Sequence, residues 1–343
     1  MALAQWREAL NGCNVDDPAQ ADPLTRWLVI SRACVFSMTV ISVLIGVLLA
    51  AADGYYSWGL AFLSLVGLVA AHAANNLLND YLDVKNGVDT EDYPRAQYSP
   101  HPLLGGLTTP GRLLQAVLLL NLLDAAIMLF LGLVAGRPWA FAFAAGGLLL
   151  SVFYVAWPVK LKHRGLGELT ALVVWGPLMT GGTYYIVAGT ITPAVWLATL
   201  PYGLLVATVL VGKHIDKRRQ DAAIGVHSIP VLLGDEASRR LNMVLMVSFF
   251  VLVIALVVSG AMGFWILLTL LAMGRLWTVL QQYRRPKPEA APAGWTVWPL
   301  WYVGWAMLLN RRAGQLFILG MVLNVLWSLA RGTLLSKVAL PWV

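Results

Sequence analysis

Long apolar runs, one after another along the chain, limit its possible folds more than any other feature. Most are about 17–25 residues long, enough to cross a hydrocarbon core of roughly 30 Å as an α-helix. With 59% hydrophobic and 12% charged residues, the composition is that of an integral membrane protein. The runs lack the alternation of a membrane β-barrel, so the sequence predicts an all-α helix bundle. The nine predicted spans are Trp27–Leu49, Trp58–Leu77, Leu113–Val134, Trp139–Val155, Leu169–Val187, Pro193–Val211, Leu241–Val258, Phe264–Leu280 and Gln315–Leu329.

The positive charges fall mainly on one side of these spans. With the N-terminus placed in the cytoplasm, 19 of the 24 Lys and Arg residues lie in the inner segments. Cytoplasmic loops of membrane proteins carry such an excess. The sequence therefore predicts a multi-pass protein of the cytoplasmic (inner) membrane with the N-terminus inside. The net charge of +7 is explained by this asymmetry and needs no nucleic acid as a partner.

The polar residues are distributed unevenly among the predicted loops. The predicted outer loops are minimal, whereas two inner loops of about thirty residues carry most of the charged side chains, which is where function is usually found. We expect a polar cytoplasmic segment at 1–24, a transmembrane core with eight spans at 25–283, a Pro-rich cytoplasmic linker at 284–295, and a Trp-rich interfacial segment with the last span at 296–343. The first 24 residues do not resemble a cleaved signal peptide.

The stretch NNLLNDYLDVKNGVD follows the second span and is the first acid-rich motif. In a helix, Asn76, Asp80 and Asp83 share one face, and Asn79 and Asp83 form a further i, i+4 pair. Clustered carboxylates are costly near lipid, so we expect something cationic among them. Hard oxygen ligands favour Mg²⁺ or Ca²⁺, and Mg²⁺ in proteins often combines one or two carboxylates with phosphate oxygens. Asp89, beyond the flexible Asn-Gly, adds a further carboxylate.

A second motif, GKHIDKRRQDAAIGVHSIPVLLG, follows the sixth span. It places Asp216 and Asp221 beside five basic side chains, including Lys213. The acids are suited to a metal ion and the bases to phosphate oxygens. A single acidic loop is usually only a solvated surface. Two of them after even-numbered spans, on the same predicted side, indicate a clamp for a metal ion and a diphosphate.

These motifs resemble those of the UbiA superfamily of intramembrane prenyltransferases. NDYLDVKNGVD resembles the family's Asn-Asp-x-x-Asp motif, and its Gly-x-Asp ending is closest to the 1,4-dihydroxy-2-naphthoate polyprenyltransferases. YVAWPVKLKHRGLGE, HPLLGGLTTPGRL and IGVHSIPVLLG resemble three further family segments. Two positions differ: His101 stands where the family commonly has Arg, and Asp216 and Asp221 are five residues apart instead of four. The wider spacing predicts either a distorted helix or a reduced role for Asp216.

The resemblance implies a UbiA-like bundle of about nine helices around a lipid-accessible cavity. It also implies Mg²⁺-dependent transfer of a polyprenyl group from its diphosphate to an aromatic acceptor similar to 1,4-dihydroxy-2-naphthoate. Asn79, Asp80, Asp83, Asp216 and Asp221 are then predicted to bind Mg²⁺; Asn76, Asp89, Arg95, Lys162 and Lys213 to bind the diphosphate; and Asp83, Asp221 and Lys162 to be catalytic.

Several alternatives remain open. Within the family, the acceptor could be 4-hydroxybenzoate, a porphyrin or a lipid, or the enzyme could be a cyclase. From other classes, a cation-coupled transporter or an inactive scaffold fits parts of the pattern. Asp124, inside the third span, is expected to pair with Arg32 or Arg275 or to act on an acceptor hydroxyl. Cys13 and Cys34 show no metal-binding spacing, and we expect no disulfide between them.

Overall fold

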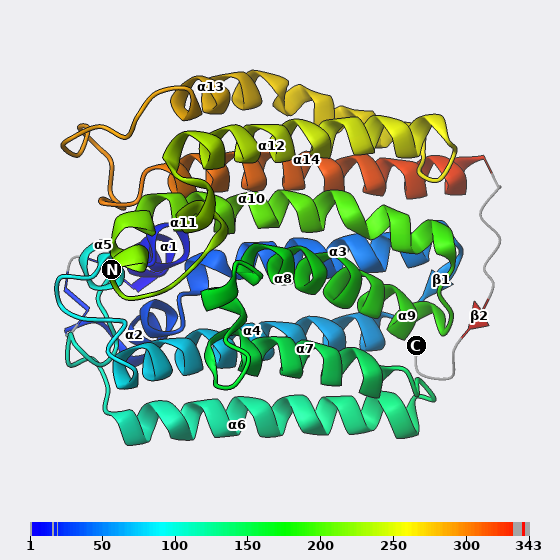
Figure 1. Ribbon diagram of the computed structural model, residues 1–343. Coiled ribbons are helices and arrows are strands. Elements are labelled where there is room, and N and C mark those ends of the chain that lie inside the picture. The colour runs from blue at the N-terminus through cyan, green and yellow to red at the C-terminus, as the bar shows by residue number, and fades with distance from the viewer. Residues whose placement is uncertain (1, 16, 19, 332–337, 340–343) are drawn as a thin grey trace.

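The computed structural model describes residues 2–15, 17–18, 20–331 and 338–339 as a bundle of long helices (Figure 1). Eight helical segments of this described chain are long and apolar enough to cross a membrane. They are η1 and α3 (Ala33–Val35, Phe36–Ala52), α4 (Trp58–Lys85), α6 and η2 (Pro110–Leu129, Phe130–Val134), α8, η4 and α9 (Gly167–Val173, Val174–Gly181, Gly182–Ala188), α10 (Pro193–Ala223), α12 (Asp235–Val258), η5 and α13 (Phe264–Ala272, Met273–Tyr283), and α14 (Tyr302–Ala330). A shorter apolar helix, α7 (Ala140–Val155), corresponds to the remaining predicted span. The predicted all-α membrane fold is confirmed.

The helices begin where the sequence supplies capping residues. The side chains of Ser57, Thr109 and Thr192 accept hydrogen bonds from backbone N–H groups in the first turns of α4, α6 and α10. Proline follows Thr109 and Thr192 at the first helical position, where its missing N–H has no helical partner to lose. These signals explain why α6 and α10 start at their prolines.

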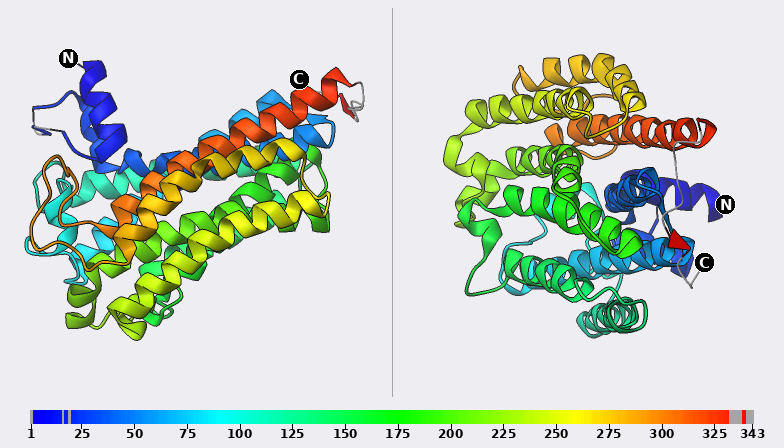
Figure 2. Two further views of the ribbon diagram at one scale, coloured as in Figure 1. Left: turned by 90° about the horizontal axis from the view of Figure 1, so that it is seen from above. Right: turned by 90° about the vertical axis from the view of Figure 1, so that its right-hand side faces the viewer.

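Helix α10 lies in the middle of the bundle, and α6 and α13 lie on opposite sides of it (Figures 1 and 2). Glycines allow α10 to approach the α8–η4 segment closely. A Cβ atom added at Gly203 would come within 2.6 Å of the Leu172 carbonyl oxygen and 2.9 Å of the Gly176 Cα. This packing brings the two helices together along the part of α10 that leads to its charged end.

The longer connections gather at one end of the bundle, together with α1 (Ala2–Gly12), α2 (Pro23–Ile30), α5 (Pro94–Tyr98) and α11 (Ile229–Leu233) (Figure 1). We call this the polar end; it is formed by residues 86–109, 156–166 and 224–234. At the opposite end the turns are short. There β1 (Tyr55–Tyr56) pairs in parallel with β2 (Val338–Ala339).

The first and last spans differ from their predicted bounds. The first was expected to be continuous from Trp27, but Asp22 caps a separate helix, α2, and Arg32 has a left-handed backbone with φ 57°. The crossing helix therefore begins at Ala33. The last span was expected from Gln315, but α14 already begins at Tyr302. Part of the Trp-rich segment thus belongs to this helix, and Trp301 and Trp305 pack with Trp295 against the core.

The expectation of no disulfide was wrong, because Cys13 and Cys34 are bonded. The break at Arg32 is the reason: it turns Cys34 toward the end of α1. Arg311 of α14 donates hydrogen bonds to the carbonyl oxygens of Asn11 and Cys34 at 3.3 and 2.8 Å. The N-terminal segment is therefore held against both α3 and α14.

Candidate active site

The last two turns of α4 carry a pair of buried carboxylates, each held by basic side chains. Arg95 of α5 donates to both oxygens of Asp80, with its Nη2 2.7 Å from Oδ2 and its Nε 3.2 Å from Oδ1. Arg32 lies 3.2 Å from the same carboxylate. The Lys162 ammonium is 2.9 Å from Oδ2 of Asp83. The cations expected among these acids are therefore present, and they come from three different connections.

The two asparagines of this motif have different surroundings. Nδ2 of Asn76 donates to the Ser31 carbonyl oxygen at 3.0 Å, and the backbone oxygen of Asn76 accepts from Arg32 at 2.9 Å. Asn76 thus fixes the helix break that aims Arg32 at Asp80. In contrast, Oδ1 of Asn79 is buried and accepts no hydrogen bond from the described residues. Asn79 lines the central cavity next to Asp80 in sequence, so this acceptor is available to a ligand.

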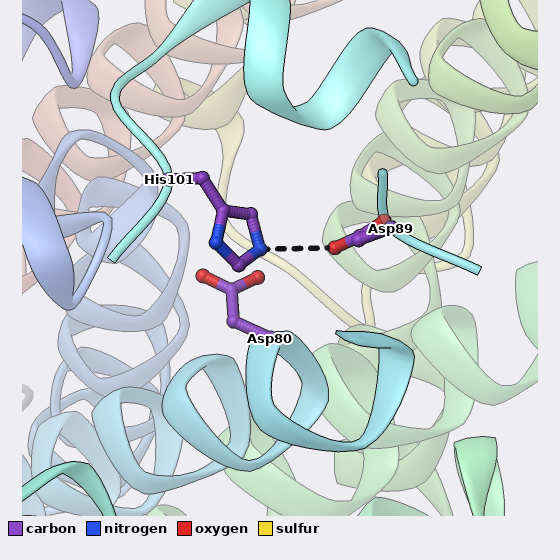
Figure 3. Close-up of side chains that lie close together, drawn as sticks. All are labelled: Asp80, Asp89 and His101. Atoms are coloured by element: carbon purple, nitrogen blue, oxygen red, sulfur yellow. Dashed lines mark hydrogen bonds and ion pairs between the residues drawn. The ribbon is translucent and has the colours of Figure 1, made fainter. Parts of the chain in front are cut away.

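Asp89 and His101 lie over Asp80, as Figure 3 shows, and ligand atoms of the three residues are within 4.8 Å of one another. Nδ1 of His101 accepts from the backbone N–H groups of Leu103 and Leu104. The ring proton therefore belongs on Nε2, which donates to Asp89 Oδ2 at 3.3 Å. In this tautomer Nε2 offers no lone pair to a metal ion. His101 acts as a donor to a carboxylate, as an arginine would.

The second motif places Asp221 in the same site. The Tyr93 hydroxyl donates to Oδ1 of Asp221, and Lys217, one turn earlier on α10, lies 3.4 Å from that oxygen and 2.8 Å from the hydroxyl. Oδ2 of Asp221 is buried without a hydrogen bond from the described residues. Asp221 therefore keeps one oxygen free, as Asn79 of α4 does.

Asp216 does not join this group. Helix α10 runs without interruption through both aspartates, and five residues turn the side chain by about 140° around the axis. Its carboxylate accepts from the backbone N–H groups of Trp301, Tyr302 and Val303 at 2.9, 3.0 and 3.0 Å. Asp216 thus satisfies the free N–H groups at the start of α14. The predicted role as a metal ligand does not fit this position.

Two more basic groups of α10 border the site. Lys213 lines the central cavity and makes no hydrogen bond or ion pair with the described part of the chain. Nδ1 of the neighbouring His214 lies 2.7 Å from Oε1 of Glu168, at the start of α8, and both side chains are buried. Glu168 therefore has a buried partner, and it also lies in the first turn of α8, where a negative charge is favourable.

The charges around the site adjust the proton affinities of its loop residues. Burial disfavours the ammonium form of Lys162, but the Asp83 carboxylate outweighs this and raises the pKa of Lys162. Burial likewise opposes ionisation of Asp89, but the His101 hydrogen bond and the Lys162 charge lower its pKa. Both shifts favour the charged forms. The site is therefore a set of compensated charges, which is how buried ions are tolerated.

A cavity of about 1250 Å³ extends from this site into the bundle. At the polar end its lining includes Asn79, Arg32 and Lys213. Further in, the lining is mostly apolar and comes from α4, α6, α7 and α9. Such a shape suits a ligand with a charged head and a long hydrocarbon tail.

The donor set fits a hard divalent cation. Asn79 Oδ1 and Asp221 Oδ2 are buried oxygens that lack a partner among the described residues, and Asp80 and Asp83 add two buried carboxylates on the same helix as Asn79. Oxygen ligands of this kind favour Mg²⁺. The arginine and lysine side chains now paired with these acids are suited to phosphate oxygens.

Sequence reasoning missed several residues of the site. Arg32 was noticed, but only as one of two possible partners of Asp124; it pairs with Asp80 instead, because the helix break turns it toward α4. Tyr93 carried no sequence signal. Lys217 was among the five basic residues noted in the second motif, but its pairing with Asp221, which their i, i+4 spacing favours, was not predicted.

Comparisons with known proteins identify the class of this protein. They place the chain among helical, multi-pass membrane enzymes that transfer prenyl groups. The model of the UbiA prenyltransferase family matches residues 39–301. The chain belongs to that family, and the predicted resemblance is confirmed.

Relatives and solved structures agree with this assignment. The chain is 29% identical over 219 residues to 1,4-dihydroxy-2-naphthoate octaprenyltransferase of Haemophilus influenzae, covering 62% of this chain and 69% of the relative. It is 26% identical over 306 residues to the protein of the same name from Escherichia coli, covering 87% and 95%. The apo structure of a UbiA homolog from Aeropyrum pernix K1 matches with a TM-score of 0.63 at 19% identity, over 83% of this chain and 97% of that one. A UbiA homolog from Archaeoglobus fulgidus, bound to GPP and Mg²⁺, matches with a TM-score of 0.52 at 14% identity, over 82% and 98%.

Proposed function

We propose that this enzyme transfers a polyprenyl group from an allylic polyprenyl diphosphate to an aromatic acceptor similar to 1,4-dihydroxy-2-naphthoate, with Mg²⁺ as the metal ion. The observation that carries the proposal is that Asp80, Asp83 and Asp221 are buried and each paired with basic side chains, one of which, Arg32, lines the polar end of a largely apolar cavity. The three acids and Asn79 would hold Mg²⁺, and the arginine and lysine side chains would hold the diphosphate.

Substrate binding then exchanges partners within the site. Arg95 and Lys162 would release their carboxylates and donate to diphosphate oxygens, and Asp80 and Asp83 would then be the residues that hold the metal ion. Asp89 stays tied to His101, and this pair supports the loop that carries Arg95. Because each charge has a partner both before and after binding, the exchange avoids leaving an unpaired buried ion, which would be costly.

The reaction begins with heterolysis of the allylic C–O bond, whose electron pair leaves with the diphosphate. Bound Mg²⁺ supplies stabilisation of that leaving group. Lys162 and Arg95 stabilise the same developing charge by hydrogen bonds that strengthen as it forms. A ring carbon of the acceptor donates an electron pair to the allylic cation, forming the new C–C bond. The ring proton is then lost to an oxygen of the released diphosphate, which restores aromaticity.

The names of the relatives support the acceptor. Two bacterial proteins that match most of their own length are named 1,4-dihydroxy-2-naphthoate octaprenyltransferases. The side chain of Lys213, which lines the cavity at its polar end, is available to either a diphosphate oxygen or an acidic group of the acceptor. We further propose a cytoplasmic-membrane location with the polar end inside, since the positive charges of the chain favour that orientation.

The proposal is tested with purified protein in nanodiscs, Mg²⁺ and a panel of allylic diphosphates. Diphosphate release is followed with and without 1,4-dihydroxy-2-naphthoate, and the lipid product is identified by mass spectrometry. Release that needs both the naphthoate and Mg²⁺ is expected. If diphosphate is released with 4-hydroxybenzoate, a porphyrin or a lipid instead, that compound replaces the naphthoate as the proposed acceptor. Release without any acceptor would indicate a cyclase. No release with any donor, together with flux in sealed vesicles, would support a transporter instead.

A further inference from the structure

A carboxyl group lies deep in the hydrocarbon part of the cavity, far from the charged site. Asp124 of α6 lines the cavity and is half-buried. Among the described residues it makes no hydrogen bond and no ion pair. The expected pairing with Arg32 or Arg275 is therefore absent, and the proposed chemistry at the polar end does not use this group.

Two polar side chains lie within one helical turn of Asp124 or of Gly67, the residue of α4 beside it, and both hydrogen-bond to the backbone. Nδ2 of Asn121, one turn earlier on α6, donates to the Val117 carbonyl oxygen at 2.8 Å. The Ser64 hydroxyl of α4 donates to the Leu60 carbonyl oxygen at 2.9 Å. Both donors serve their own helix backbones. Asp124 therefore depends on whatever fills the cavity, water or a ligand.

The depth of Asp124 can be measured along α4. Its Oδ1 would be 3.4 Å from a Cβ atom at Gly67, so it lies at the level of that residue. Gly67 precedes Asp80 by thirteen residues on the same helix, which is about 20 Å along its axis. A peptide residue has three chain bonds and spans at most about 3.5 Å, so a four-bond isoprene unit spans roughly 4.7 Å. A prenyl tail with its diphosphate at Asp80 thus reaches Asp124 after about four units.

We propose, on the basis of the function proposed above, that Asp124 sets the preferred length of the prenyl donor at about four isoprene units. A tail of this length ends at the carboxyl group and leaves it in contact with water. The cavity continues past Asp124 with apolar lining that includes Leu131, Ala140 and Phe141. A tail of eight units must therefore cover the carboxyl group with hydrocarbon, which removes its water and gives it no hydrogen bond in return.

The test compares donors of different length in wild-type protein and two variants. Asp124→Leu removes the polar group, and Asp124→Asn keeps its size and polarity. For each protein, kcat/KM is measured with geranylgeranyl (four-unit) and octaprenyl (eight-unit) diphosphate. Wild type is expected to prefer the four-unit donor. Asp124→Leu is expected to shift the ratio toward the eight-unit donor by roughly tenfold or more, and Asp124→Asn much less.

Leu122→Ala serves as a matched control, because Leu122 is an exposed residue of the same helix and is absent from the cavity lining. Binding of inert thiolodiphosphate analogues of both lengths provides a readout that does not require turnover. Wild-type preference for the longer donor, or an unchanged ratio in Asp124→Leu, would overturn the proposal. If no donor reacts but the analogues still show the expected order of binding, the proposed reaction fails while the role of Asp124 stands.

Discussion

The two acid motifs of this enzyme look alike in sequence but are used differently by the structure. At the end of α4, Asp80 and Asp83 are three residues apart and both point into the site. Near the end of α10, Asp221 points into the site, whereas Asp216 caps the start of α14. One helix therefore contributes two carboxylates, and the other contributes one carboxylate and the ammonium group of Lys217.

The difference follows from helix geometry. Residues three or four apart share a face, whereas residues five apart are separated by about 140°. The residue one turn before Asp221 is Lys217, so a cation occupies the position that an i, i+4 acid would hold. The comparison teaches that the number of acids in a motif does not give the number of acids in a site. The spacing of the acids relative to the helix period decides how many of them share the helix face that points into the site.

The largest loss of turnover is expected from a substitution in the acid motif of α4. Asp83→Asn keeps the size of the side chain but removes the charge that pairs with Lys162 and is available to Mg²⁺. Turnover should fall by roughly a hundredfold or more, measured as diphosphate release under saturating donor and acceptor. The variant should still elute as a monodisperse protein. Wild-type turnover in a correctly inserted Asp83→Asn protein would contradict the clamp.

A smaller effect, on binding of the donor, is expected from removing the charge of Lys217 on α10. Lys217→Gln removes the ammonium that contacts both Asp221 and the Tyr93 hydroxyl. The donor KM should rise roughly tenfold, because one phosphate-binding cation is lost, while kcat changes less. Lys85→Gln is the control, since Lys85 is exposed at the end of α4. Equal KM values in Lys217→Gln and Lys85→Gln would remove Lys217 from the binding site.

The sequence predicted the class of fold, most of the spans and the α4 motif, because these depend on local composition and on spacing within one helix. It did not predict the partners of each acid. Arg32 reaches Asp80 only because the chain leaves the helix at that residue, and that backbone break also brings Cys34 to Cys13. Tyr93 reaches Asp221 across 128 positions of the chain. Such contacts depend on how separate helices pack, which no local pattern contains.

The smallest effect on catalysis is expected at Asp216, and it separates the two aspartates of α10. Asp216→Asn leaves one acceptor oxygen for three backbone N–H groups of α14, so buried donors lose their partners. The melting temperature should fall by several degrees, roughly 2–10 °C for a loss of this kind, while turnover at a permissive temperature stays within about threefold of wild type. The same substitution at Asp221 should do the opposite, since it removes charge from the site and leaves the α14 cap intact. Thermal unfolding and diphosphate release, measured on both variants in the same nanodiscs, give the comparison. A loss of turnover at Asp216 as large as that at Asp221 would mean that the start of α14 is coupled to the chemistry, and the two aspartates would then belong to one functional unit.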